Sequence, residues 1–277
     1  MYPALINYFP IANNIVNPTI NRRIGASLVL YENDIQMLQK LLSSIANTPL
    51  TIELVIVDNS PTTKLSAIFK DIEYIQYYHD PTNPGFSTSH NKAISNIKDI
   101  DYCVVLNPDI YFEPEVIPEL INYLDRNTEI GLIQPKICFP NGDIQYLCKR
   151  YPSLLVLFFR RFVPRQLHFL FQNHLDWFEM KDMEYDRIVD VTYLSGCFML
   201  FRKKYLDEIG CFDENIFMYF EDADITIRMA AKYRSVFYPH VQVFHYWAKG
   251  SYNSWKLAFV NIQSAFYFFC KHGWKII

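Results

Sequence analysis

The sequence predicts an α/β protein in which helices flank a mainly parallel central sheet. Between residues 24 and 126, apolar runs of strand length alternate with segments of helical periodicity, which is the pattern of a parallel sheet with crossover helices. The first of these runs is continuously apolar, as expected for a strand that is covered on both faces. Polar residues follow several of the strands, at the edge where such sheets bind ligands.

The first half of the chain contains four predicted strands and the helices that connect them. Residues 24–31 (IGASLVLY) form the first strand. Residues 33–47 form the first helix, because apolar side chains recur there at helical spacing and Asn33 or Asp34 can cap its start. The other elements predicted in this half are strands over 52–60, 73–78 and 101–109 and helices over 62–70, 83–97 and 115–126.

The second half is less regular, and residues 150–180 are aromatic and basic without a clean period. We expect two strands, over 131–139 and 141–147, with a turn between them, and then a long strand over 190–203. The later predicted elements are a short helix over 204–210, a helix that ends near Lys232, a strand over 235–245 and an aromatic-rich helix over 253–272.

The composition indicates a globular protein and argues against nucleic acid as a partner. Of the 277 residues, 51% are hydrophobic and 20% are charged, so the chain can bury a sizeable core. The net charge is −3, so there is no basic field to attract nucleic acid. The six cysteines include no C-x-x-C pair, which is typical of reduced, buried thiols and favours a cytoplasmic protein.

Several common sequence signals are missing. No basic residue precedes Arg22, so we expect no signal peptide, and no apolar run approaches the ~20 residues of a membrane span. The 8 glycines form neither G-x-G-x-x-G nor G-x-x-x-x-G-K-[ST], which argues against a Rossmann dehydrogenase or a P-loop enzyme. If the chain binds a nucleoside diphosphate, a metal ion must therefore neutralise most of its charge.

Polar side chains follow three of the predicted strands. Tyr31 follows the first, Asp58 and Asn59 the second, and Asn107 and Asp109 the fourth. The carboxylate of Asp109 is a candidate ligand for a divalent cation that bridges two phosphates, although Asn-Pro-Asp is also ordinary turn chemistry. Asp58 and Asn59 either hydrogen-bond a base or ribose or simply start the next turn.

The segment FMYFEDADITIRM (217–229) contains the carboxylates Glu221, Asp222 and Asp224. A helix dipole accounts for one or two acidic residues in a first turn. An aromatic wall desolvates a carboxylate in part and raises its pKa toward a value that is useful for a base. Arg228 lies four residues after Asp224, which suggests a structural ion pair, so Asp222 is the candidate base.

Two further residues remain open on local grounds. His245 ends a predicted strand, and a lone histidine is more often structural unless it meets a metal. Lys249 follows in a short polar turn, where it either covers a diphosphate or is solvated.

Seven motifs occur together, namely ASLVLYEND, VIVDNS, NPGFSTSHNKAI, LNPDI, GCFMLFRK, GCFDENIFMYFEDADITIR and VFHYW. Their order resembles that of the inverting glycosyltransferases of family 2. Within that family, the chain is similar to the bacterial rhamnosyltransferase branch that builds O-antigen and other surface polysaccharides. The resemblance covers most of the chain, about residues 24–250.

This resemblance implies a GT-A fold and a set of site residues. It implies that Asp222 is the catalytic base and that Asp109 and His245 bind Mg²⁺ or Mn²⁺. Asn107 replaces the first aspartate of the D-x-D motif, so one charged ligand is missing. The residues implied for donor binding are Tyr31, Asp58, Asn59, Phe86, His90, Asn91, Asn107 and Lys249. Those implied for acceptor binding or as scaffold are Glu221, Asp224, Arg228, Gly196 and Cys197.

The resemblance also implies a division of the chain. An N-terminal extension (1–23) would precede the GT-A domain (24–250), and a C-terminal helix (251–277) would follow it. Within the GT-A domain, residues 24–130 would form the nucleotide-sugar half and residues 131–250 the acceptor half.

The implied reaction transfers L-rhamnose from dTDP-rhamnose to a hydroxyl of a lipid-linked or polysaccharide acceptor. One alternative is the same fold with another donor, such as UDP-galactose, UDP-galactofuranose or a UDP-N-acetylhexosamine. A second alternative, from a different class, is an inactive GT-A relative that acts as a binding subunit.

Residues 151–171 and 255–275 interleave basic and large apolar side chains. This pattern suits helices that lie in a bilayer interface, but core packing or an oligomer contact explains it equally well. We therefore expect a cytoplasmic protein that is peripheral on the inner face of the cytoplasmic membrane.

Overall fold

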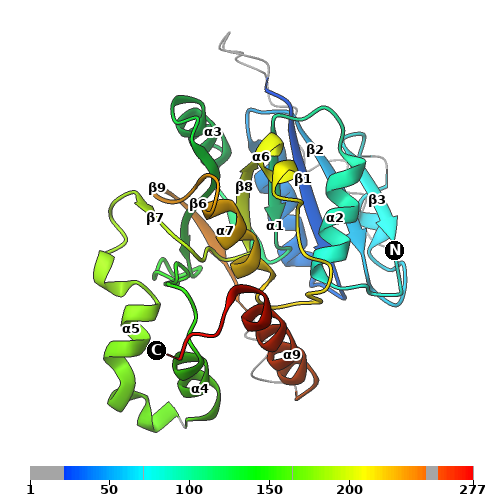
Figure 1. The fold of residues 1–277 in the computed structure, drawn as a ribbon. Helices are drawn as coiled ribbons and strands as arrows, with labels where there is room; N and C mark the ends of the chain where they lie inside the picture. Colours follow the sequence, from blue (N-terminus) through cyan, green and yellow to red (C-terminus); the bar gives the residue numbers. More distant parts are fainter. Residues whose placement is uncertain (1–21, 71, 164, 248–254, 277) are drawn as a thin grey trace.

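The computed structural model describes residues 22–70, 72–163, 165–247 and 255–276. The predicted N-terminal extension therefore lies almost wholly outside the described residues, as does Lys249. Helices pack on both faces of one central sheet, which has nine strands in the described part of the chain (Figure 1). The α/β fold class predicted from the sequence is confirmed.

One half of the sheet is parallel and follows the predicted order of elements. Its strands are β1 (Ile24–Leu30), β2 (Ile52–Asp58), β3 (Ile75–His79) and β4 (Tyr102–Leu106). They lie side by side in the order β3–β2–β1–β4, and each pairs in parallel with its neighbour. All four carboxyl ends therefore lie at one edge of the sheet, where ligands bind in such folds.

The other half of the sheet mixes parallel and antiparallel pairs. Its strands are β5 (Ile110–Phe112), β6 (Ile130–Cys138), β7 (Val189–Asp190), β8 (Phe198–Arg202) and β9 (Arg234–His245). β8 lies between β4 and β6 and is antiparallel to both, whereas β6 and β9 are parallel. β5 and β7 pair antiparallel with β9, so the start of β5 meets the end of β9.

Helices cover both faces of the sheet. They are α1 (Ile35–Asn47), α2 (Phe86–Asn96), α3 (Val116–Arg126), α6 (Lys203–Glu208) and α7 (Glu221–Ala230), with a 3₁₀ turn η2 (Ser66–Ile68). α1 and α3 pack on one face, and α2, α6 and α7 pack on the other. Asp34 caps α1 as predicted, because its carboxylate accepts hydrogen bonds from the N–H groups of Gln36 and Met37.

Three predicted elements differ from the structure. Residues 141–147 form a turn with a single bridge from Ile144 to Cys138, because Gly142 adopts a φ of +91°, which a strand does not allow. The predicted strand over 190–203 is broken, since residues 191–197 leave the sheet between β7 and β8. The predicted helix over 62–70 shrinks to η2.

A helical lobe, formed by α4 (Leu154–Phe162), η3 (Arg165–Phe171), α5 (Gln172–Phe178) and α9 (Trp255–His272), packs at the lower end of the molecule in Figure 1. A short 3₁₀ turn, η4 (Lys181–Met183), follows α5. Buried Phe159, Phe178, Phe268 and Phe269 hold the lobe together. α9 confirms the predicted aromatic-rich C-terminal helix. Among the described helices, none is long and apolar enough to cross a membrane.

Candidate active site

Asp109 and His245 lie side by side because β5 pairs with β9. Ile110 lies opposite His245 in this pair, and the N–H of Tyr246 donates to the carbonyl of Asp109. His245 Nε2 lies 3.4 Å from Asp109 Oδ1, and the two side chains are only 6% and 23% exposed. Asp109 Oδ1 is buried and accepts no hydrogen bond from the described protein.

Gln145 fixes the orientation of His245. The Gln145 amide N–H₂ donates to the carbonyl oxygens of His245 at 2.5 Å and of Cys138 at 3.4 Å. Its Oε1 therefore faces His245 Nδ1, at 3.0 Å, and this network assigns the hydrogen to Nδ1. In the neutral imidazole with this tautomer Nε2 carries the lone pair, and it lies 3.4 Å from Asp109 Oδ1. Two acceptors that lie this close repel unless a cation joins them.

The Asp109–His245 pair fits a divalent cation. Carboxylate oxygen and neutral imidazole are ordinary metal ligands, and an amide that orients the ligating histidine is typical of metal sites. The described residues contain no group of three His, Cys, Asp or Glu that could hold an ion. A cation bound here would therefore take its remaining ligands from phosphate oxygens and water, as Mg²⁺ commonly does.

Asp222 is the second residue of α7, which follows a strained aromatic segment. Tyr219 and Phe220 have positive φ values of +70° and +68°, which cost large residues about 1–3 kcal/mol each and cluster at functional sites. The Asp222 carboxylate accepts hydrogen bonds from the N–H groups of Gly196 at 3.1 Å and Ala223 at 2.9 Å. These contacts fix the direction of the carboxylate.

Burial raises the pKa of Asp222 above the ordinary aspartate value. The positive charge of Lys149 is the largest influence that opposes this rise in pKa, and a hydrogen bond from the Tyr193 hydroxyl acts in the same direction. Lys149 Nζ lies 4.6 Å from the centre of the Tyr193 ring, and burial lowers the pKa of this lysine. A desolvated carboxylate with a raised pKa is suited to accept a proton.

Residues 195–198 connect Asp222 to Asp109. The N–H of Gly196 donates to Asp222, and the carbonyl of Cys197 accepts a hydrogen bond of 2.9 Å from the N–H of Asn107. Burial raises the pKa of Cys197 to about 12, and the charges of both Asp109 and Asp222 add to that rise. The turn therefore contacts Asp222 at one end and, through Asn107, the segment that leads to Asp109.

Gln134 of β6 holds this connecting turn in place. Its amide N–H₂ donates to the carbonyl oxygens of Ser195 and Phe198, at 2.5 and 2.7 Å, and its Oε1 accepts a hydrogen bond from the N–H of Ser195 at 3.2 Å. Gln134 is almost completely buried. The turn is therefore rigidly attached to the centre of the sheet, which explains why the chain leaves the sheet here instead of continuing as a strand.

Phe86 reaches the same site from the start of α2. A side-chain carbon added to Gly196 would lie 3.5 Å from the Phe86 ring and 3.4 Å from Asp222 Cβ, so Gly196 lies between them. His90 packs on Phe86 with ring centres 4.2 Å apart, and burial lowers the pKa of His90 to about 3. Neutral His90 hydrogen-bonds the Ser27 hydroxyl at 2.7 Å and so supports Phe86.

The polar residues after β1 and β2 lie at the predicted edge of the sheet. Asp58 is fully buried, and its carboxylate accepts a hydrogen bond from the Tyr77 hydroxyl at 2.7 Å. Asn59 donates to the Ser89 hydroxyl at 2.7 Å, and its Oδ1 is buried without a partner. Tyr31 is half exposed. Contacts of these three residues with a donor stay a prediction.

The side chain of Asn91 hydrogen-bonds the segment that precedes α7. Its amide N–H₂ donates to the carbonyl of Phe212 and to Glu214, each at 2.9 Å, and its Oδ1 accepts a hydrogen bond from the N–H of Phe212. Asn91 therefore ties α2 to the segment before α7. A donor contact of Asn91 stays a prediction and would have to compete with these bonds.

Asp224 and Arg228 form the predicted ion pair, with Arg228 Nη2 2.8 Å from Asp224 Oδ2. The other Asp224 oxygen contacts Lys271 at 2.6 Å and His272 at 2.7 Å, both at the end of α9. Burial acts to raise the pKa of Asp224, but these cationic partners lower it overall. Glu221 is buried with an unpaired Oε2, and burial raises its pKa well above the ordinary value.

Sequence reasoning missed Gln134, Gln145, Lys149 and Tyr193. The two glutamines act on partners 61 and 100 residues away, and a single sequence gives no local signal for such contacts. Lys149 directly precedes the aromatic and basic stretch of residues 150–180, for which bilayer contact, core packing or an oligomer contact was predicted, and no electrostatic role was predicted for this lysine.

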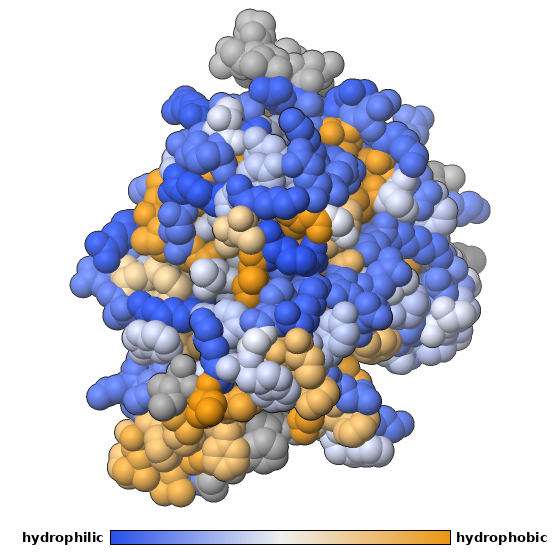
Figure 2. Space-filling view, in the orientation of Figure 1, coloured by the Kyte–Doolittle hydropathy of each residue, from blue (hydrophilic) through white to orange (hydrophobic). Residues whose placement is uncertain are grey.

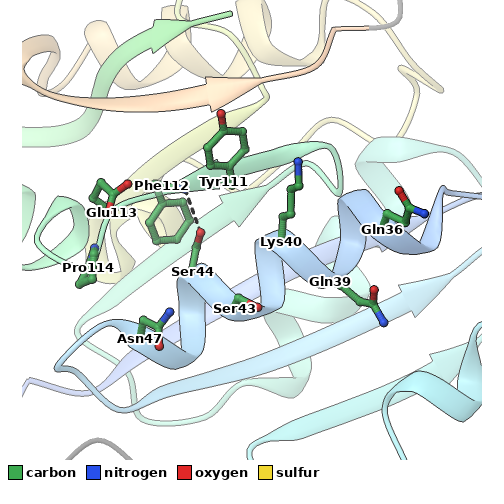
Figure 3. A pocket seen from close by; sticks show the side chains of 10 residues that line it. All are labelled: Gln36, Gln39, Lys40, Ser43, Ser44, Asn47, Tyr111, Phe112, Glu113 and Pro114. Atoms are coloured by element: carbon green, nitrogen blue, oxygen red, sulfur yellow. Dashed lines mark hydrogen bonds between the residues drawn. The ribbon is translucent and has the colours of Figure 1, made fainter. Parts of the chain in front are cut away.

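An open groove with a volume of 640 Å³ runs along α1 beside β5 (Figure 3). Lys40 points toward Tyr111 in this view, with Nζ 5.6 Å from the ring centre, and hydrogen-bonds the Tyr246 hydroxyl. Tyr246 directly follows His245 in the sequence, but neither Asp109 nor His245 lines the groove. The predicted site residues do not line it.

Comparisons with known proteins identify relatives of the chain. The chain is 26% identical over 228 residues to N-acetylglucosaminyl-diphospho-decaprenol L-rhamnosyltransferase from Mycobacterium tuberculosis, which covers 76% of this chain and 71% of the relative. It is 23% identical over 220 residues to rhamnosyltransferase WbbL from Escherichia coli, with 76% and 78% covered.

A solved structure has the same fold. It is the mannosyltransferase PcManGT from Pyrobaculum calidifontis in complex with GDP-Man and Mn²⁺, with a TM-score of 0.62, 16% identity, and 92% of this chain and 66% of that chain covered. The chain spans less than two thirds of the length of this structure. The likeness confirms the GT-A fold.

The sequence model of Glycosyl transferase family 2 matches residues 28–210. This range includes Asp58, Asp109 and Gly196, whereas Asp222 and His245 follow it. Because the match covers well over half of the 277 residues, the chain belongs to glycosyl transferase family 2.

Proposed function

We propose that the chain is a metal-dependent, inverting rhamnosyltransferase. It transfers L-rhamnose from dTDP-rhamnose to a hydroxyl of a lipid-linked or polysaccharide acceptor in the synthesis of bacterial cell-surface glycans. The observation that carries this proposal is the connection, through residues 195–198, between the Asp109–His245 pair and the desolvated Asp222. The Asp109–His245 pair is suited to a leaving group that gains negative charge. Asp222 is suited to take the proton from an acceptor hydroxyl.

In this proposal Asp109 and His245 hold Mg²⁺ or Mn²⁺ at the diphosphate of the donor. The ion supplies positive charge that stabilises the departing nucleoside diphosphate. Asp58 and the residues around it hold the nucleoside at the carboxyl ends of β1 and β2. The other proposed donor contacts are Tyr31, Asn59, Phe86, His90, Asn91, Asn107 and Lys249.

Asp222 acts as the general base. Its carboxylate takes the proton of the acceptor hydroxyl while the hydroxyl oxygen forms a bond to the anomeric carbon of the donor. The bond from that carbon to the diphosphate oxygen breaks in the same step, so one displacement inverts the configuration. Gly196 holds the carboxylate in direction, and Lys149 limits the rise of its pKa, so that Asp222 is ionised often enough to react.

The names of the two curated relatives support the choice of sugar, because both are rhamnosyltransferases. The decaprenol in one of these names supports a lipid-linked acceptor. Such an acceptor places the reaction at a membrane surface. We therefore place the protein in the cytoplasm, at the inner face of the cytoplasmic membrane, which is consistent with the free cysteines of the described chain. Residues 24–130 would hold the donor and residues 131–250 the acceptor.

A donor-hydrolysis assay tests the proposal. The full chain is incubated with dTDP-rhamnose, UDP-galactose or UDP-N-acetylglucosamine, with Mg²⁺, with Mn²⁺, or with a chelator. We expect release of dTDP from dTDP-rhamnose only when the metal is present. Release of UDP from a UDP-sugar would show that this sugar nucleotide, and not dTDP-rhamnose, is the donor. Binding of nucleotide without hydrolysis or transfer of any donor would overturn the proposal in favour of an inactive binding subunit.

A further inference from the structure

One side of α9 is apolar and exposed. Trp255, Phe259, Ile262 and Phe266 follow one another at spacings of four, three and four residues, so they share one face of the helix. Their exposed fractions are 77%, 57%, 48% and 61%. The opposite side of α9 is buried in the helical lobe, so the helix is docked and this face is left uncovered by the described chain.

Exposed apolar residues also lie on α4, on η3 and after α9. The N–H of Leu154 donates to the carbonyl of Lys275 at 2.9 Å, which joins the end of the chain to the start of α4. Figure 2 shows apolar side chains gathered at the lower end of the molecule, where Figure 1 has α4 and η3. The term "apolar face" here means the four α9 residues together with exposed Phe158, Phe169, Leu170, Trp274 and Ile276.

The two segments that build the apolar face carry no acidic residue. Residues 144–175 contain five Lys or Arg, and residues 246–277 contain four Lys, without any Asp or Glu in either segment. Four of these nine cations are engaged within the described chain: Lys149 acts on Asp222, Lys271 pairs with Asp213 and Asp224, and Arg150 and Arg160 pair with Asp182 and Glu179. The whole chain, by contrast, has 29 acidic and 26 basic residues. Lys256 and Lys275 are exposed next to the apolar residues. A matching partner is therefore apolar where the aromatic rings enter and negatively charged around them.

We propose that the apolar face docks on the surface of an anionic phospholipid bilayer, with α9 lying in the plane of the interface. Helices with Trp and Phe on one side and flanking lysines bind bilayers in this way. A second copy of the chain is a poorer partner, because two such faces would bring like charges together. This inference goes beyond the transfer reaction and does not depend on the identity of the sugar.

Vesicle flotation with the full chain tests the inference. Vesicles of phosphatidylcholine alone are compared with vesicles that also contain phosphatidylglycerol, at low and at high salt. We expect binding to the anionic vesicles, weaker binding to the neutral ones, and partial loss at high salt. Phe259→Ser with Phe266→Ser should lower the partition constant about tenfold per side chain or more, because each ring contributes buried apolar area. Gln263→Ala, at an exposed position of the same helix, should bind like the wild type.

Two results would overturn the inference. One is equal vesicle binding by the wild type and the double variant. The other is a stable dimer in light scattering that the double variant abolishes while the wild type ignores anionic vesicles. Hydrolysis of dTDP-rhamnose in solution is measured in parallel, because it separates the membrane proposal from the transfer proposal. A double variant that keeps the hydrolysis rate of the wild type but no longer binds vesicles supports docking, whatever sugar is transferred.

Discussion

His245 Nε2 lies 3.4 Å from Asp109 Oδ1, and Gln145 accepts the hydrogen of Nδ1, so that Nε2 carries the lone pair of the neutral imidazole. A buried pair of acceptors is unfavourable in itself. A cation bound to both atoms would make the pair favourable, which is the role proposed for it. The orientation of the histidine is therefore as important for the site as its identity.

Replacement of Gln145 by alanine should weaken binding of a divalent metal by roughly 10–100-fold. Without the amide, the imidazole can rotate and can place its hydrogen on the nitrogen that faces Asp109. Calorimetric titration with Mn²⁺ in the presence of dTDP measures the affinity. Gln242→Ala, an exposed glutamine on the same strand β9, is the matched control. Unchanged Mn²⁺ affinity in Gln145→Ala would contradict the assigned role.

Replacement of Asp222 by asparagine should preserve donor binding and slow transfer by about 10²–10⁴-fold, the usual cost of losing a general base. The amide oxygen can still accept the hydrogen bond from Gly196, so the fold of the site should survive. Single-turnover transfer and the dissociation constant of the donor are measured separately. Asp207→Asn, at an exposed carboxylate outside the site, is the control, and normal turnover in Asp222→Asn excludes this residue as the base.

The acid limb of the pH profile should report on Asp222. Because burial raises the pKa of this carboxylate, the fraction in the base form falls at a higher pH than for an ordinary aspartate. Lys149 lowers that pKa, so Lys149→Met should move the acid limb of kcat/KM to still higher pH, while Lys149→Arg keeps the charge and should stay near the wild type. A limb that does not move in Lys149→Met would refute the electrostatic role.

The parallel half of the sheet could be predicted because its signals are local. The continuous burial of the strand over Tyr102–Leu106 and the Asp34 cap of α1 depend on residues that are close together in the sequence. The Asp224–Arg228 pair could be predicted for the same reason, since its partners lie one helical turn apart.

The centre of the site could not be derived in this way. The turn at Ser195 looks like part of an apolar strand, and only Gln134, 61 residues earlier, shows that the chain bends there. The contacts of Asp224 with Lys271 and His272 likewise depend on the docking of α9. Sequence periodicity indicates which face of a helix or strand a residue occupies, but it does not indicate which distant element that face contacts. These contacts could therefore be identified only from the three-dimensional structure.

Lys271 should be important for stability because it pairs with both Asp213 and Asp224, each at 2.6 Å. Burial acts to raise the pKa of both carboxyl groups, but their partners lower it overall. A carboxyl group whose folded-state pKa is lowered contributes stability above its unfolded pKa, and the contribution is lost as the pH falls toward the folded-state value. Lys271→Met should therefore lower the free energy of unfolding by roughly 2 kcal/mol at neutral pH, the order of a hydrogen bond to a charged group, because Asp224 keeps Arg228 as a partner.

Urea unfolding measures this loss at neutral pH and again below the ordinary carboxyl pKa of about 4. The difference from the wild type should shrink in acid, because the unfolded chain takes up protons at these two carboxyl groups first, and the stability that comes from their lowered folded-state pKa is progressively lost. Lys203→Met is the matched control, since its partner Asp207 is exposed and such pairs contribute only about 0.5 kcal/mol. If Lys271→Met lost the same free energy at both pH values, the effect would come from packing of α9, and the ion pairs would not be what fixes this helix to α7.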